Sequence, residues 1–177
     1  MSLTVVTEAL ERAKWIDRPA QSAQALVTRA YSAAGPAGQT VHAVLHGDWL
    51  GHSLHAATVV VPLGAWTTTV VLDATKQDAG ADAALALGLV TALFAAAAGW
   101  TDYHEMNDSH VRRIGAVHAS LNVAAIGVMG ASLVQRRRGH RSSGRALALL
   151  GFAVVLVSAY LGGAMTYERG AGVGRRS

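Results

Sequence analysis

Four long apolar stretches without a single Asp, Glu, Lys or Arg dominate the last two-thirds of this sequence. An α-helix rises about 1.5 Å per residue, so a helix of about 20 residues crosses a hydrocarbon core of roughly 30 Å. The sequence therefore predicts an integral membrane protein with an all-α fold, a four-helix transmembrane bundle. We expect its spans at residues 54–72, 83–101, 114–134 and 146–167.

The first 50 residues carry a different pattern, in which apolar residues recur at helical spacing between charged ones. This pattern predicts amphipathic helices over residues 1–17 and 20–34, and a third piece over 40–50 that leads into the first span. We expect an N-terminal cap of residues 1–50 and a bundle of residues 51–177. The helices of the cap would lie on the membrane surface or on a partner, or they would pack as a soluble cap on the loops of the bundle.

The composition excludes several classes of protein. The 177 residues include no Cys, which rules out disulfides, thiolate zinc sites and cysteine-ligated iron–sulfur clusters within them, but they include eight His. The Arg residues flank the spans, as topology signals and lipid contacts do, and this pattern argues against nucleic-acid binding. Five Arg between residues 135 and 145 favour a cytoplasmic third loop with both termini outside the cell membrane.

Residues that carry chemistry gather where spans one and three begin and spans two and four end. In an antiparallel bundle these four places meet at one end, which we expect to be the functional end, on the extracytoplasmic side. The candidates are His52, His55, Trp100, Asp102, Tyr103, His118, Asn122 and Tyr160.

His55 and His118 are the first candidates for ligands, since an ionisable side chain inside a membrane is costly and usually faces the bundle interior. Two His from different helices can hold haem b, one on each side of the porphyrin. Alternatively His52 and His55, three residues apart on one helix face, could share a metal ion with His118 or Asp102. A third alternative is that the His side chains only make structural hydrogen bonds or relay protons. The loop of residues 102–110 also contains His and acidic residues, but such loops are usually solvated.

Several short motifs are similar to those of a known family. The segments are WLGHSLH at residues 49–55, VPLGAW at 61–66, GWTDY at 99–103, and YLGG at 160–163. Together with Asp73, His118, Asn122, Tyr167 and the glycine-rich residues 170–174, they resemble the small four-helix membrane family named domain of unknown function 2231. The resemblance covers roughly residues 40–174.

The resemblance implies a membrane redox setting, because members of that family occur alone or joined to a Rieske iron–sulfur domain. Our leading hypothesis is a redox-associated subunit that exchanges electrons with a separate Rieske-type or quinone-linked partner, alone or as a homo-oligomer. The chain departs from the family at Ser53 and Ala56, where proline is favoured, and at Val60 and Ala164, where polar residues are frequent. A rival expectation is a non-catalytic scaffold or anchor in the lipid bilayer, whose N-terminal helices dock a partner protein.

Overall fold

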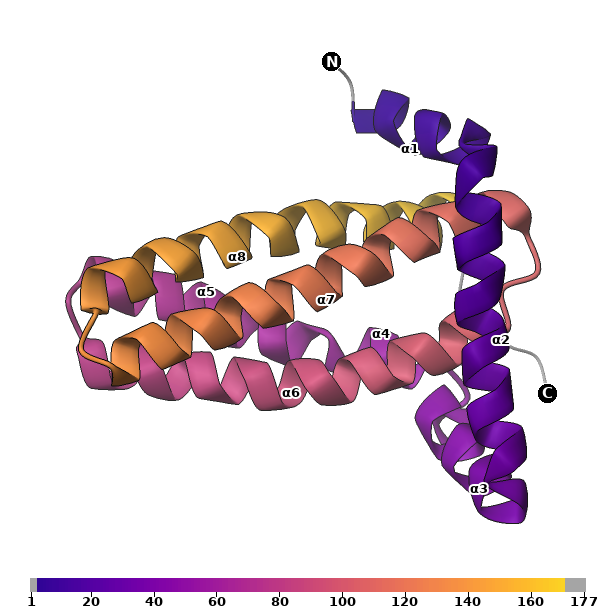
Figure 1. Cartoon of the computed structure of the whole chain (residues 1–177), viewed down its shortest axis with the longest axis horizontal. Coiled ribbons are helices and arrows are strands. Elements are labelled where there is room, and N and C mark those ends of the chain that lie inside the picture. Colours follow the sequence, from indigo (N-terminus) through magenta and orange to yellow (C-terminus); the bar gives the residue numbers. More distant parts are fainter. Residues whose placement is uncertain (1–2, 171–177) are drawn as a thin grey trace. The chain divides into compact units, whose positions relative to one another are not determined.

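The computed structural model describes residues 3–170, and within that range every regular element is helical (Figure 1). Four helices are long and apolar enough to cross a membrane. They cover Leu54–Ala74, Asp78–His104, Ser109–Arg137 and Arg141–Glu168. Each contains one of the four predicted spans, so the prediction of an all-α membrane protein with four spanning helices is confirmed. The glycine-rich segment after residue 170, which carried part of the resemblance, lies outside the described residues.

The first membrane helix is interrupted, as the mid-span proline leads one to expect. Helix α4, Leu54–Thr58, ends one turn before Pro62, and helix α5, Val60–Ala74, continues after the single residue Val59. Proline has no backbone N–H, and its ring clashes with the carbonyl oxygen four residues earlier, which here belongs to Thr58. The break therefore falls where the proline forces it.

The other membrane helices are α6 (Asp78–His104), α7 (Ser109–Arg137) and α8 (Arg141–Gly163). A π-helical turn, Ala164–Glu168, follows α8. The chain forms two compact units, and α6, α7 and α8 contribute residues to both. The first unit consists of residues 1–57, 97–119 and 159–177, and the second of residues 58–96 and 120–158.

The second unit is a bundle of α5 with the adjoining parts of α6, α7 and α8, which run side by side (Figure 1). Its core consists of Trp66, Leu85, Ala92, Ala125, Met129, Ala148 and Val155. Small residues let the helices approach closely, because a lipid solvent gives apolar helices no hydrophobic reason to associate. Gly88 and Gly151 show this packing most clearly, since added Cβ atoms would meet the Trp66 indole and the Met129 side chain.

Ion pairs between helices tie the charged end of the second unit together. The Arg136 side chain has no exposed area, and its guanidinium donates to Asp73 and, at 3.1 Å, to Asp82. Arg141 donates to Asp82, and Arg145 donates to Asp78 at 2.6 Å. Three of the five Arg that favour a cytoplasmic third loop are therefore bound to acidic side chains. Arg137 and Arg138 are exposed, so the topology signal rests mainly on these two.

Three N-terminal helices belong to the first unit: α1 (Leu3–Arg12), α2 (Asp17–Ala33) and α3 (Gly35–His46). The predicted break at residues 17–19 was misplaced, because a 3-10 turn at Lys14–Ile16 separates α1 from α2. The third helix also begins at Gly35, before the predicted start at residue 40. In both cases a proline, Pro19 or Pro36, lies in the first turn of the helix. Backbone N–H groups in the first turn have no acceptor within the helix, so a proline there removes no hydrogen bond.

Helix α2 is held against the ends of α6 and α7 within this unit. Ile16 and Ala20 pack with Tyr103, and Gln24 donates to the carbonyl oxygens of Tyr103 and Met106 at 2.9 and 3.0 Å. These contacts fix the N-terminal helices on the loop that joins α6 to α7.

Arg113 reinforces the same attachment from α7. Its guanidinium donates two hydrogen bonds of 2.8 Å to the Asp17 carboxylate and a further one to the carbonyl oxygen of Glu11. The hydrogen bonds from Arg113 hold the pKa of Asp17 below its ordinary value. The Asp17 carboxylate is therefore charged at neutral pH, as a partner of arginine must be.

Candidate functional site

The residues predicted for the functional end lie in the first unit, with one exception. His52, His55, Trp100, Asp102, Tyr103, His118 and Tyr160 all belong to it. Asn122 belongs to the second unit, where its side-chain oxygen accepts a hydrogen bond of 2.8 Å from Ser158. The antiparallel arrangement of the spans thus gathers the chemistry of four chain segments in one compact unit.

His55 and His118 form a close pair. The two rings come from α4 and α7, their centres are 6.1 Å apart, and their planes are nearly perpendicular, at 83°. Both side chains are partly buried. Two imidazoles at this distance can share a proton or a metal ion.

A glycine lies against each ring of this pair. A Cβ atom on Gly99 of α6 would lie 2.9 Å from Nδ1 of His55, and one on Gly162 of α8 would lie 3.1 Å from Cε1 of His118. A side chain at Gly99 would require the His55 ring to shift, and one at Gly162 would require the His118 ring to give by a few tenths of an ångström. All four membrane helices therefore contribute to the surroundings of the pair: α4 and α7 provide the rings, and α6 and α8 provide the glycines.

Ser53 and Asp102 fix the start of the helix that carries His55. The Ser53 hydroxyl accepts a hydrogen bond of 3.1 Å from the backbone N–H of Ala56, so Ser53 caps α4, and it donates its own proton to the Asp102 carboxylate. Asp102 thus contacts the residue that caps the helix of His55, an arrangement that the sequence alone did not reveal.

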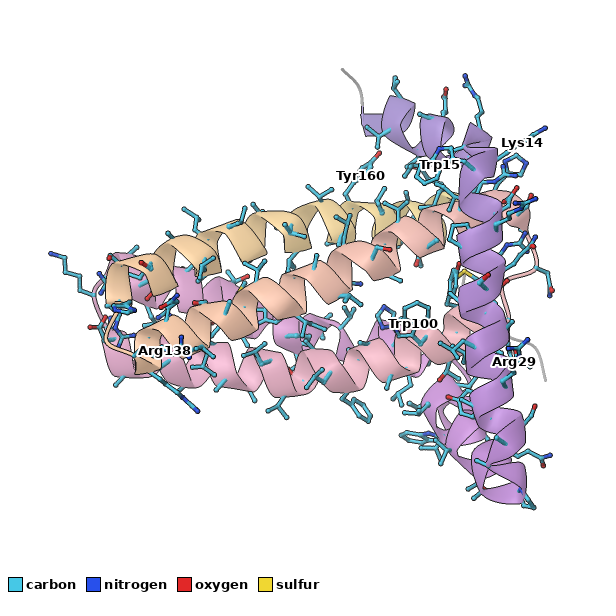
Figure 2. The ribbon with its side chains drawn as sticks, in the orientation of Figure 1. Lys14, Trp15, Arg29, Trp100, Arg138 and Tyr160 are labelled. Atoms are coloured by element: carbon cyan, nitrogen blue, oxygen red, sulfur yellow. The ribbon has the colours of Figure 1, made fainter. Side chains whose placement is uncertain are left out.

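The remaining predicted residues have other surroundings. His52 is exposed, and its Nδ1 lies 3.4 Å from the carbonyl oxygen of Ser53. The rings of Trp100 and Tyr103 pack edge to face with their centres 5.6 Å apart, and Tyr103 is buried in the contact with α2. Figure 2 shows Trp100 and Tyr160 on the helices α6 and α8.

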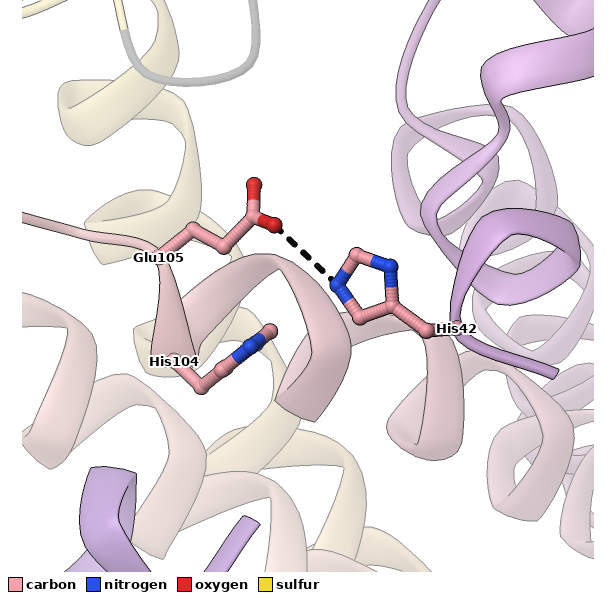
Figure 3. A group of neighbouring side chains, drawn as sticks. All are labelled: His42, His104 and Glu105. Atoms are coloured by element: carbon pink, nitrogen blue, oxygen red, sulfur yellow. Dashed lines mark ion pairs between the residues drawn. The ribbon is translucent and has the colours of Figure 1, made fainter. Parts of the chain in front are cut away.

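A second group of polar side chains gathers where α3 meets the end of α6. His42 of α3, His104 at the end of α6 and Glu105, which follows it, bring one potential ligand atom each to within 4.8 Å of one another (Figure 3). His46, one turn after His42, joins this group through Glu105. In the described part of the chain, no other set of three or more His, Cys, Asp or Glu side chains meets this criterion.

Sequence reasoning missed His42 and His46, because residues 40–50 looked like a connector. A usable signal was present, since the two His are four residues apart and must share one face of a helix. The loop of residues 102–110 was expected to be solvated, yet its His104 and Glu105 are the residues that meet His42.

These features define an integral membrane protein in which four apolar helices form a bundle and the first unit carries the paired histidines His55 and His118. The comparison with protein families agrees with this class. A family model described as predicted membrane protein, DUF2231, matches residues 51–175, so the chain belongs to this family. No curated protein and no solved structure matches the chain.

Proposed function

We propose that the protein is a redox-associated membrane subunit that binds a metal ion or haem b between His55 and His118. The single observation that carries this proposal is the pairing of two intramembrane imidazoles from different helices, with ring centres 6.1 Å apart. Histidine within a membrane span is rare, and it usually marks a ligand site or a proton path. In this proposal the bound centre exchanges electrons with a separate Rieske-type or quinone-linked protein.

The distance between the two imidazole rings suits a single metal ion. Metal–nitrogen bonds are about 2.0–2.1 Å long, so two imidazoles on opposite sides of one ion have their ligating nitrogens about 4 Å apart. Ring centres 6.1 Å apart are compatible with that separation. The close approach of Gly99 and Gly162 favours a single ion, because a porphyrin between the rings would require the helices to separate.

Asp102 supports the same proposal as a positioning residue. Its carboxylate holds the Ser53 cap of α4, and α4 carries His55 two residues later. Groups that orient metal ligands typically affect metal affinity 10- to 100-fold when they are removed. We therefore assign His55 and His118 as ligands. We assign Asp102 as the residue that orients α4, the helix that carries His55.

The test compares cofactor content in single His variants. His118→Ala removes one proposed ligand, so the protein purified in mild detergent should lose its redox-active metal ion or haem while it still inserts into the membrane and elutes as the wild type does. Metal analysis and a visible spectrum measure the content.

His140→Ala is the matched control, because His140 is exposed in the loop between α7 and α8 and bonds to Gln135. It should retain the full content. A His118→Ala protein with undiminished cofactor would remove this residue from the centre and with it the proposed site.

A scaffold or anchor is the second candidate function, favoured by the apolar side chains on the N-terminal part. Trp15 is 77% exposed and Trp49 is 67% exposed, and Figure 2 shows Trp15 beside Lys14 in the turn between α1 and α2. Exposed aromatic residues suit a membrane interface or a docked partner. A folded protein that contains neither metal nor haem would favour this candidate.

A further inference from the structure

We propose that His42, His104 and Glu105 form a second, independent metal site, which binds a divalent transition-metal ion of the zinc type. The three residues come from α3 and from the end of α6, and all of them belong to the first unit. Two imidazoles and one carboxylate are a ligand set that zinc takes in proteins, with the fourth position left to water. The site does not depend on the His55–His118 centre, because it uses none of the same residues.

The distances between the ligands agree with a shared ion. Nε2 of His42 lies 3.1 Å from Oε1 of Glu105, and the ring centres of His42 and His104 are 5.1 Å apart with their planes at 82°. Two imidazoles at a tetrahedral angle on one ion, with metal–nitrogen bonds of about 2.0–2.1 Å, have ring centres on the order of 5 Å apart. Small rotations of the side chains suffice to bring the three ligand atoms onto one ion.

His104 is already held in the form that a metal ligand needs. Its Nδ1 lies 2.7 Å from the carbonyl oxygen of Thr101, which can only accept, so Nδ1 carries the proton and donates it. In the neutral ring Nε2 then carries the lone pair. A bond from the second ring nitrogen to a backbone carbonyl is the usual way in which proteins fix the tautomer of a ligating histidine.

Tyr31 supports both imidazoles from α2. Its hydroxyl is hydrogen-bonded at 2.6 Å to the hydroxyl of Thr101, the residue whose carbonyl oxygen orients His104. Its ring centre is 5.1 Å from that of His42 and 5.7 Å from that of His104. The two rings are therefore packed from a third helix rather than projecting freely into solvent.

His46 and Asp48 orient the carboxylate. Glu105 directs Oε1 toward His42, and its other oxygen, Oε2, lies 2.8 Å from Nε2 of His46. Nδ1 of His46 is held in turn at 2.6 Å by Asp48. This chain of contacts fixes Glu105 with one oxygen directed toward the proposed ion, and it gives His46 the role of a positioning residue.

The surroundings favour a softer divalent ion that keeps one solvent ligand. The His42 side chain is 22% exposed and Glu105 is 45% exposed, so water can reach the ion. Magnesium and calcium prefer six or more oxygen ligands, whereas imidazole suits zinc, copper and nickel.

Isothermal titration with Zn²⁺ tests this site, using the full-length protein in mild detergent after removal of metals with a chelator. The measurement uses the His118→Ala background, so that the His55–His118 centre cannot contribute. We expect one Zn²⁺ per chain and no heat with Mg²⁺.

Variants assign the ligands in the same background. Glu105→Gln keeps the shape of the side chain and should weaken Zn²⁺ binding at least tenfold, His42→Ala should weaken it by more, and His46→Ala should weaken it 10- to 100-fold through Glu105. His110 is an exposed histidine at the start of α7, so the His110→Ala variant is the control and should bind Zn²⁺ as tightly as the His118→Ala protein does.

Circular dichroism checks that each variant is folded. The proposal is overturned if the folded parent protein binds no Zn²⁺, or if folded Glu105→Gln and His42→Ala bind it as tightly as the parent.

Discussion

Replacing Arg136 with alanine should lower the free energy of unfolding of the detergent-solubilised protein by about 3–5 kcal/mol, the usual cost of removing one partner from a buried ion pair. The Arg136 side chain has no exposed area, and Asp73, its main partner, is 9% exposed. Without the guanidinium, the cation left beside the Asp73 carboxylate among the described residues would be Arg145, whose Nε lies 3.6 Å away. Ser132, which accepts a hydrogen bond of 3.1 Å from Nε of Arg136, would lose that bond as well.

Denaturant titration followed by circular dichroism measures this effect. Arg138→Ala is the matched control, because Arg138 lies in the same loop region and projects away from the helices (Figure 2). We expect this control to change the unfolding free energy by less than about 0.5 kcal/mol, as exposed substitutions usually do. Equal effects of the two substitutions would show that the network does not hold this end of the bundle.

Gly88→Ala should destabilise the second unit by about 1–3 kcal/mol, the cost of overpacking a core. A Cβ atom on Gly88 would overlap Nε1 and Cδ1 of the Trp66 indole, and Trp66 is only 4% exposed, so the ring has little room to move. Alanine is the better helix former by about 1 kcal/mol, and this gain offsets only part of the clash.

Gly127→Ala separates packing from helix propensity. Gly127 is exposed on α7, and an added Cβ atom there meets nothing within 4 Å. This variant should be as stable as the wild type or slightly more stable. If Gly88→Ala were equally harmless, the Trp66 indole of α5 could not be packed tightly against Gly88 of α6.

The membrane helices could be predicted because hydropathy alone specifies them. The absence of charge over about 20 residues decides that a segment spans the membrane, whatever it packs against. The break before Pro62 follows from one local steric rule. The pairing of His55 with His118 could also be anticipated, since short loops make neighbouring spans antiparallel and bring the start of span one close to the start of span three.

The contacts of the N-terminal helices could not be predicted in the same way. Periodicity indicates that α2 and α3 have an apolar face, but it does not specify what covers that face. Gln24, Tyr31 and His42 meet the end of α6 through contacts between residues more than 60 positions apart in the chain. The same reason explains why the Arg residues between positions 135 and 145 looked like topology signals, although Arg136, Arg141 and Arg145 bind Asp73, Asp78 and Asp82.

The most direct test of the central claim is a reduced-minus-oxidised visible spectrum of the detergent-purified wild-type protein, recorded together with its metal content. The claim is that the His55–His118 pair holds a redox centre. It predicts about one haem b per chain, with its difference bands, or about one redox-active metal ion per chain. In either case the His118→Ala protein should lack this centre. A folded protein without colour and without a redox-active metal ion would contradict the claim and would favour a scaffold whose N-terminal helices dock a partner.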